Sequence, residues 1–293
     1  MMEHNKKRKS KIRIKKLLCC LVMLAAVLAF LVWGIGKGIT YLSTRPSTEN
    51  GRPMYYLFIG ADEKAGNEAD AVVLLARNDK KQEATFISIP SNTRIAGRQE
   101  GKSMLLRQTF AEGGSEETKS AIENLLHIRI DAYAVVNYAD FENYMSHWGP
   151  VNMYVEQYME HTDATGQNDI GLFQGYQSLE QKDALGYVRF IEKDNGELGR
   201  MQRQERFMKA ILEKMQGHSA LYNWAMVHHY WNAVETDLTA DEAGKLAYHL
   251  TNYPAAGCKF IIFPGEMQKT GKEQAWVVNP VEVQKVIAMT MEQ

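Results

Sequence analysis

The chain has 293 residues, of which 45% are hydrophobic, and this length suits one large or two small globular domains. Its formal net charge is only −1, yet the first 16 residues hold eight Lys or Arg and a single Glu, so the rest of the chain is acidic. A short basic N-terminal segment followed by an acidic chain argues against nucleic-acid binding through a basic surface of the acidic part.

Residues 17–35 form an apolar run of 19 residues without a charged side chain. A membrane-spanning helix needs roughly 20 such residues. The alternative is a cleaved signal peptide, whose apolar core is shorter, about 7–15 residues, and is followed by a small-residue cleavage site. Here the run continues through Trp33 without an Ala-x-Ala pattern, which favours an uncleaved anchor.

The basic residues precede the apolar run, and Lys/Arg-rich flanks remain in the cytoplasm. We therefore expect a single-pass protein of the cell membrane, with its N-terminus in the cytoplasm. Its expected parts are a basic tail over 1–16, a transmembrane helix over 17–35, a tether over 36–52 and an extracytoplasmic domain over 53–293. That domain contains one cysteine, Cys258, so it has no internal disulfide and depends on its hydrophobic core.

Apolar runs rich in β-branched and aromatic residues predict three consecutive strands, at 55–60, 71–76 and 84–90. Their connections are short, 10 and 7 residues, which favours antiparallel pairing. Further along the chain we expect helices at 115–127, 139–148, 197–216 and 240–252, and strands at 131–138 and 258–265. This mixed order predicts an α/β fold, a three-layer α/β/α sandwich around a central mixed β-sheet.

Two carboxylates are expected at one edge of that sheet. Asp62 follows the first strand and Asp70 precedes the second, and in an antiparallel hairpin these two ends coincide. The third strand runs back to the same edge and ends at Ser91 and Asn92. Two carboxylates there suit a hard cation such as Mg²⁺, completed by water and phosphate oxygens. The alternative is that both are ordinary loop acids.

The helix expected from Glu197 carries polar side chains on its apolar side. At about 100° per residue, Arg200 and Gln204 project on the same side as Phe207, and so does Glu197. Arg203 falls outside the apolar stripe and is expected in solvent. A buried charge is either paired or bound to a charged ligand. Arg200 therefore either forms an internal pair with Glu197 or binds an anion.

Taken together, these motifs resemble the LytR-CpsA-Psr family of membrane-anchored cell-wall proteins. The matching phrases, in the family's order across roughly residues 53–293, are YLFIGAD, FISIPSNT, IENLLHIRIDAYAVVNY, LGYVRF, GRMQRQ and FPGE. The resemblance implies a long apolar pocket for a polyprenyl-pyrophosphate-linked glycan, with Mg²⁺ and arginines at the pyrophosphate. It further implies a phosphotransferase that moves the glycan phosphate to a sugar hydroxyl of peptidoglycan. No DNA-binding motif supports a transcriptional role.

The resemblance also assigns the expected site residues. Asp62 and Asp70 match the two acids associated with Mg²⁺. The substrate-binding positions of the family correspond to Arg189, Arg200 and Gln204, which are expected to be catalytic together with Glu197. Glu197 stands where the family has the shorter aspartate. Arg189 comes near the end of the run LGYVRF, which is expected to be strand-like.

Four positions depart from the family pattern: Glu68 and Ile191 replace arginines, while Ser91 and Asn92 replace an arginine and an aspartate. Three phosphate-binding arginines are therefore missing. A charge-assisted hydrogen bond contributes about 1.5–3 kcal/mol, so the hold on pyrophosphate is expected to weaken. Basic residues of neighbouring loops that would have to compensate are Lys64, Arg94 and Arg107.

The sequence is therefore compatible with three functions. The first is an active glycopolymer transferase with a remodelled site. The second is a catalytically degenerate relative that binds polyprenyl lipid or the cell-wall machinery as a scaffold or regulator. The third is a pyrophosphatase-like hydrolase that uses water as the acceptor.

Overall fold

A computed structural model describes residues 27–34, 36–42, 52–62, 67–98, 101–163, 165–192, 196–270 and 273–292. The chain divides into two compact units, Met1–Pro46 and Ser47–Gln293. In the first unit, residues 27–34 and 36–42 are helical. None of the helices described here combines the length and the apolar character that crossing a membrane requires. Much of the predicted transmembrane segment, residues 17–26 and Ile35, lies outside the described residues.

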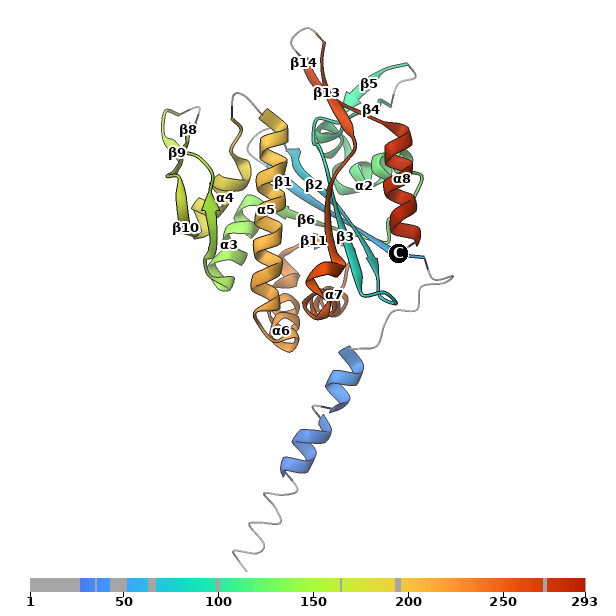
Figure 1. Cartoon of the computed structure of the whole chain (residues 1–293), viewed down its shortest axis with the longest axis vertical. Helices are drawn as coiled ribbons and strands as arrows, with labels where there is room; N and C mark the ends of the chain where they lie inside the picture. The colour runs from blue at the N-terminus through green and yellow to red at the C-terminus, as the bar shows by residue number, and fades with distance from the viewer. Residues whose placement is uncertain are drawn as a thin grey trace, which may run out of the picture. The chain divides into compact units, whose positions relative to one another are not determined.

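The second unit is built on a six-stranded mixed sheet (Figure 1). Its strands, in spatial order, are β11 (Glu235–Thr236), β6 (Ala132–Asn137), β1 (Met54–Asp62), β2 (Glu68–Asn78), β3 (Glu83–Ile89) and β12 (Cys258–Ile262). The predicted antiparallel arrangement of the first three strands is confirmed. Strand β6 adds in parallel to β1, β12 adds in parallel to β3, and β11 closes the other edge in the antiparallel direction.

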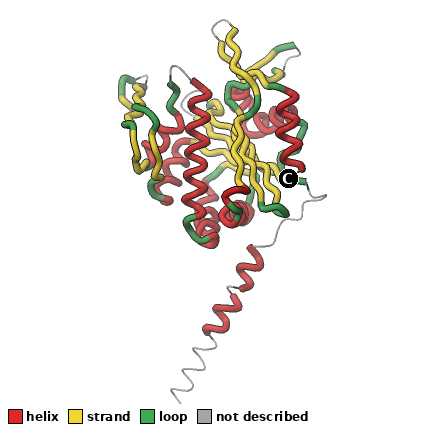
Figure 2. Tube along the Cα trace, viewed as in Figure 1, coloured by secondary structure: helices red, strands yellow, loops and turns green. Residues whose placement is uncertain are grey.

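Helices cover both faces of this sheet (Figure 2). They are α2 (Leu106–Leu126), α3 (Tyr138–Trp148), α4 (Gln181–Arg189), α5 (Gly196–Gln216), α6 (Ala220–Tyr230), α7 (Ala240–Asn252) and α8 (Pro280–Glu292), with short 3₁₀ turns at Trp231–Ala233 and Ala255–Gly257. Leu57 of β1 packs in the core formed with α2 and α8, whereas its neighbour Tyr56 packs in the core formed with α5 and α7. This alternation follows from the pleat of a strand, and it gives the expected α/β fold with a central mixed sheet.

Four two-stranded ribbons accompany the large sheet. They pair β4 (Arg94–Ala96) with β5 (Ser103–Leu105), β7 (Val151–Val155) with β10 (Gly175–Leu179), β8 (Met159–Thr162) with β9 (Asn168–Leu172), and β13 (Gly265–Thr270) with β14 (Glu273–Val278). A separate apolar cluster holds β7 to β10 against α3, α4 and α5. Helix α5 therefore lies between two cores.

Two local predictions differ from the structure. The run LGYVRF, expected to be strand-like, belongs to α4, because a short apolar run fits a buried helix as well as a strand. Helix α2 begins at Leu106 rather than at residue 115, and Gly113 and Gly114 interrupt it with non-helical backbone angles. The predicted helix at 115–127 is therefore the second half of a kinked helix.

Candidate functional site

A buried cluster surrounds Arg200 in the first turns of α5. Arg200 is 5% exposed. Its Nη1 donates to Asp70 Oδ1 at 3.2 Å, and its Nη2 donates to Ser91 Oγ at 2.9 Å and to Glu197 Oε1 at 2.8 Å. One guanidinium thus connects β2, the segment after β3 and the start of α5.

The sheet register explains why these residues meet. Asp62 pairs with Glu68 and Ala61 with Ala69, and the register shifts between Gly60 and Ala61, so Asp70 lies at a β-bulge. Bulges commonly redirect a side chain next to a functional site. Asp70 and Ser91 therefore reach one sheet edge, as predicted. Asp62 is described through its backbone alone.

Ser91 binds two of the three charged members of the cluster, Arg200 and Glu197. Its Oγ accepts from Arg200 and donates to Glu197 Oε1 at 3.0 Å, and its backbone N–H donates to the same oxygen at 3.3 Å. Burial lowers the pKa of Arg200, but the carboxylates of Glu197 and Asp70 raise it more, so the net shift is upward and the guanidinium stays charged. The internal Arg200–Glu197 pair is therefore formed, and Arg200 is not the poorly paired cation that simple anion binding would require.

Tyr138 also joins the cluster, a residue that the sequence patterns did not predict there. Its hydroxyl donates to Asp70 Oδ2. The guanidinium carbon of Arg189 lies 4.4 Å from the centre of the Tyr138 ring, a cation–π contact, and Arg189 Nη1 lies 3.8 Å from Asp169 Oδ2. Because β6 runs parallel to β1, the residue that follows β6 reaches the edge where β1 ends. The position of a polar aromatic residue directly after a strand was the signal that could have identified Tyr138.

Gln204 and Arg203 hold neighbouring elements together. Gln204 Nε2 donates to the carbonyl of Val188 in α4 at 3.2 Å, so Gln204 faces inward as predicted but contacts α4 rather than the acid cluster. The expectation that Arg203 lies in solvent is wrong, because it is 1% exposed. Its Nη2 donates to the carbonyl of Phe190 at 2.6 Å, and its Nη1 lies 3.3 Å from Glu156 Oε1. The apolar cluster around β7 to β10 buries a second side of α5. The apolar stripe in the sequence of α5 predicts only one buried side, and Arg203 lies outside that stripe.

The other residues that depart from the family pattern differ from one another in their surroundings. Glu68 Oε2 lies 3.2 Å from Arg107 Nε, so one of the three basic residues considered above pairs with Glu68, from the first turn of α2 rather than from a loop. Asn92 Nδ2 donates to the carbonyl of Gln274 in β14 at 3.4 Å. Ile191 is 55% exposed and lies where an arginine would face solvent or a ligand.

Carboxylates outnumber guanidinium groups in the cluster, so binding of a cation there would be more favourable than the approach of another negative charge. One guanidinium faces two carboxylates, those of Asp70 and Glu197. Asp70 retains 28% of its side-chain exposure, so its oxygens are not fully enclosed by Arg200 and Tyr138. Within the described ranges, no group of three or more His, Cys, Asp or Glu could hold a metal ion.

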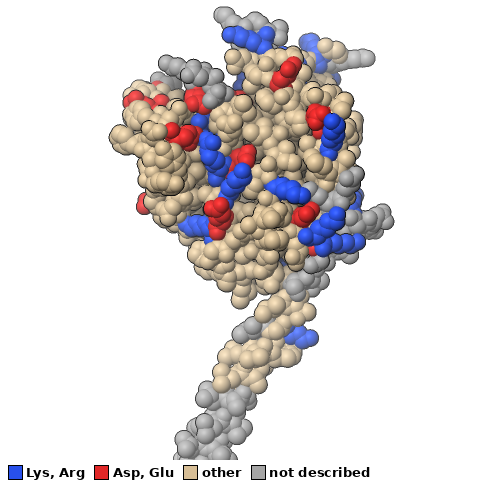
Figure 3. Space-filling view, viewed as in Figure 1, with Lys and Arg blue, Asp and Glu red and all other residues tan. Residues whose placement is uncertain are grey.

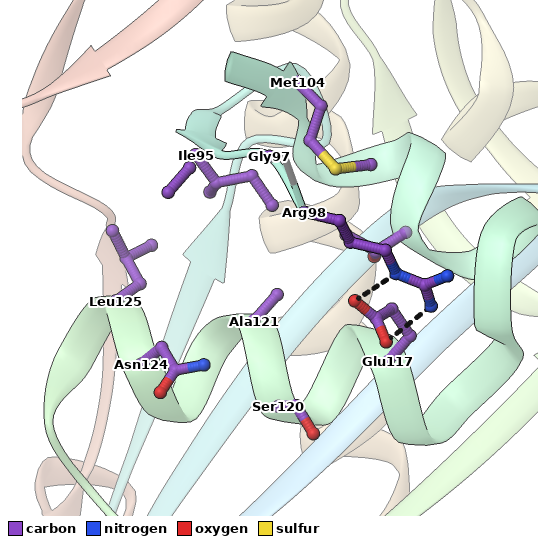
Figure 4. A pocket seen from close by; sticks show the side chains of 11 residues that line it. Ile95, Gly97, Arg98, Met104, Glu117, Ser120, Ala121, Asn124 and Leu125 are labelled. Atoms are coloured by element: carbon purple, nitrogen blue, oxygen red, sulfur yellow. Dashed lines mark hydrogen bonds and ion pairs between the residues drawn. The ribbon is translucent and has the colours of Figure 1, made fainter. Parts of the chain in front are cut away.

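A separate cavity of about 480 Å³ lies between α2 and the β4–β5 ribbon (Figure 4). Its lining mixes apolar side chains such as Met104 and Leu125 with the Arg98–Glu117 ion pair, in which Arg98 Nη2 and Glu117 Oε2 are 2.8 Å apart. Neither Asp70 nor Arg200 lines this cavity. It is therefore not an apolar pocket that ends at the acid cluster.

Comparison with solved structures identifies the fold. The crystal structure of B. subtilis TagV superimposes with a TM-score of 0.71 at 21% identity, over 83% of this chain and 99% of that one. The structure titled "TagT bound to LIIa-WTA" has a TM-score of 0.67 at 22% identity, over 85% of this chain and 94% of that one. At these identities the similarity establishes the shared fold.

Sequence comparison identifies relatives and the family. The polyisoprenyl-teichoic acid–peptidoglycan teichoic acid transferase TagU of Halalkalibacterium halodurans is 30% identical over 70% of this chain, and TagV of Bacillus subtilis is 27% identical over 57% of it. These alignments span 66% and 45% of the two relatives. The model of the LytR_cpsA_psr family matches residues 37–292. The chain therefore belongs to the LytR-CpsA-Psr family.

Proposed function

We propose that the chain is a membrane-anchored phosphotransferase that moves a polyprenyl-pyrophosphate-linked glycopolymer to peptidoglycan during cell-wall assembly. The observation that carries the proposal is the Arg200–Asp70–Tyr138–Arg189 chain of contacts at one sheet edge. Relatives named as teichoic acid transferases support the reaction class. The donor lipid, the peptidoglycan acceptor and the membrane are its partners.

Each residue has a proposed role. Arg189 binds the pyrophosphate, since its side chain keeps 32% of its exposure and its carboxylate neighbour, Asp169, is 3.8 Å away. Arg200, held by Glu197, fixes the orientation of Asp70, and Gln204 holds α4, which ends at Arg189, against α5. Mg²⁺, bound by Asp62 and Asp70 with phosphate oxygens, would supply charge neutralisation.

The reaction then depends on positioning and charge stabilisation. The oxygen of a peptidoglycan sugar hydroxyl forms a bond to the phosphorus that carries the glycan. The bond from that phosphorus to the bridging oxygen of the pyrophosphate breaks, and polyprenyl phosphate leaves with the electron pair. The hydroxyl proton is lost to solvent or to a carboxylate of the site.

A catalytically degenerate scaffold is the second candidate, and the hydrogen bonds that already engage both terminal nitrogens of Arg200 favour it. Ser91 and Glu197 occupy hydrogen-bonding positions of this guanidinium that an anion would otherwise use. Such a protein would bind polyprenyl lipid or cell-wall machinery without transferring the polymer.

Mass spectrometry of lipid that co-purifies with the full chain from membranes tests the lipid-binding half of the proposal. We expect a polyprenyl pyrophosphate carrying a glycan on the parent protein. Arg189→Met should lose this lipid while melting at the parent's temperature, because the side chain it replaces is partly exposed. A parent protein that carries no polyprenyl lipid would count against the transferase and against a lipid-binding scaffold, and would leave a scaffold that binds the cell-wall machinery.

Magnesium binding should require the donor. Asp70 already accepts from Arg200 and Tyr138, so we expect calorimetry of the lipid-free full chain to show little Mg²⁺ binding. With a polyprenyl pyrophosphate added, phosphate oxygens complete the coordination and binding becomes measurable. Tight binding without lipid, or no binding with it, would contradict the proposed site.

The proposed topology makes the large domain accessible from outside. Because the basic tail precedes the apolar run, protease added to intact protoplasts should digest residues 53–293. A cytoplasmic enzyme measured in the same sample should survive and serves as the control for cell integrity. Full protection of the domain would reject the outward orientation.

A further inference from the structure

Four aromatic side chains lie exposed on the ribbons formed by β7 to β10. Their exposed fractions are 46% for Tyr154, 51% for Tyr158, 71% for Phe173 and 88% for Tyr176. The rings form two pairs, Tyr154–Tyr176 with centres 5.1 Å apart and Tyr158–Phe173 with centres 5.6 Å apart. Scattered exposed aromatic residues are ordinary, but a group of four marks an interaction surface. We call these four residues the ring platform.

The backbone beneath the ring platform is firmly packed. Tyr154 and Tyr176 are opposite each other in the β7–β10 register. Their neighbours Val155 and Leu172 are buried in the core shared with α3 and α4. Because side chains alternate between the faces of a strand, burying these neighbours directs the rings outward. The platform is therefore presented on a fixed scaffold, with little conformational entropy to lose on binding.

The segment that carries the ring platform is acidic in sequence, and arginines from α4 and α5 pair with two of its carboxylates, Asp169 and Glu156. Residues 151–180 contain no Lys or Arg and five Asp or Glu. Figure 3 shows acidic side chains on the corner formed by β8 and β9. This composition favours a neutral partner over an anionic membrane surface or a polyphosphate chain. Neutral hydrogen-bonding side chains are exposed around the rings instead, namely Asn152, Gln174 and Ser178.

Exposed rings bordered by amides and a hydroxyl fit a neutral carbohydrate. The face of an aromatic ring is electronegative and attracts the weakly positive C–H faces of a sugar ring, while amides exchange hydrogen bonds with sugar hydroxyls. We propose that the ring platform binds the neutral glycan strand of peptidoglycan, an inference that rests on the proposed function because it gives the acceptor polymer a docking surface.

The location of the ring platform is consistent with that use. Strand β9 carries Asp169, which contacts Arg189 at 3.8 Å, and Phe173 follows four residues later. Asp169, Gly171 and Phe173 alternate with the buried Ile170 and Leu172. Four residues of strand span about 13 Å. A glycan strand lying along this line would extend from the ring platform toward Arg189.

Sedimentation with peptidoglycan sacculi stripped of anionic polymers tests the inference. Full-length protein in detergent should co-sediment with the sacculi. The double variant Phe173→Ala/Tyr176→Ala should bind at least tenfold more weakly, and so should Phe173→Leu/Tyr176→Leu, which keeps apolar area but removes the flat rings. The ring-preserving pair Phe173→Tyr/Tyr176→Phe should bind like the parent protein.

Tyr222→Ala is the matched control, since Tyr222 is 45% exposed in α6, away from these ribbons. It should not change binding to sacculi. Equal binding by the Ala double variant and the parent would overturn the inference, as would undiminished binding by the Leu variant. Co-sedimentation with anionic phospholipid vesicles that is lost in the Ala double variant, together with no binding to sacculi, would identify a membrane surface instead and would also overturn the inference.

The assay contains no donor lipid and needs no turnover. If transfer is later shown to be absent, loss of binding in the Ala variant still supports the ring platform. If transfer is present but binding to sacculi does not depend on the rings, the ring platform is rejected as a binding surface and the proposed function stands.

Discussion

Arg200→Met should lower the free energy of unfolding by about 3–5 kcal/mol, because it leaves buried carboxylates without their cation. Glu197 and Asp70 would both lose the guanidinium, and Ser91 Oγ would lose a donor. The side chain of Glu197 is 11% exposed, so water cannot replace the lost partner easily. For a domain of this size the melting temperature should fall by roughly 6–20 °C.

Arg107→Met is the matched control for this substitution. Arg107 also pairs with a carboxylate, Glu68, at 3.2 Å, but 42% of its side chain is exposed and the pair is screened by solvent. Such pairs contribute about 0–1 kcal/mol. The melting temperatures of the two variants should therefore differ clearly in thermal unfolding. An unchanged or raised melting temperature for Arg200→Met would show that Arg200 serves a ligand rather than the fold.

Arg203→Met should have a comparable effect on stability, about 3–5 kcal/mol, although nothing in the helical periodicity of α5 suggests it. The side chain of Arg203 is 1% exposed and joins Glu156 in the loop after β7, Glu192 after α4 and the carbonyl of Phe190. Removing it takes the buried cation away from both carboxylates and removes a donor from the carbonyl of Phe190, between α5 and the ribbons.

Arg206→Met provides the comparison for Arg203, because Arg206 Nη2 binds the same carboxylate oxygen, Glu156 Oε1, at 2.7 Å. Its side chain is 44% exposed, so the expected loss is about 0–1 kcal/mol. Chemical denaturation with urea measures the loss of unfolding free energy in both variants. Similar losses for the two variants would contradict the assignment of Arg203 as the buried connection between α5 and the ribbons.

The sequence predicts the frame of the candidate site well, because that frame depends on short-range signals. Short turns dictate the antiparallel β1–β2–β3 arrangement, and this arrangement brings Asp70 and Ser91 to one edge. Helical periodicity likewise indicates that Arg200 and Gln204 face inward. Both inferences need only local geometry and the two characteristic repeats of secondary structure.

The parts that were not predicted depend on long-range packing. Arg203 is buried because the β7–β10 ribbon and α4 cover a second side of α5, and no pattern within α5 encodes that contact. Tyr138 meets Asp70 only because β6 joins β1 in parallel. The hydrogen bond from Arg200 to Ser91 likewise depends on a residue 109 positions away in the chain.

Transfer of labelled polymer tests the central claim most directly. The full chain, a polyprenyl-pyrophosphate-linked glycopolymer and peptidoglycan sacculi are incubated with Mg²⁺. We predict label in the insoluble peptidoglycan and an equal amount of polyprenyl phosphate in the organic phase. Asp70→Asn should slow transfer by about 10²–10³-fold, the range found when a charge-stabilising group is removed from a site. Release of soluble polymer phosphate would indicate a hydrolase, and bound lipid without any label in peptidoglycan would contradict transferase activity and identify a scaffold.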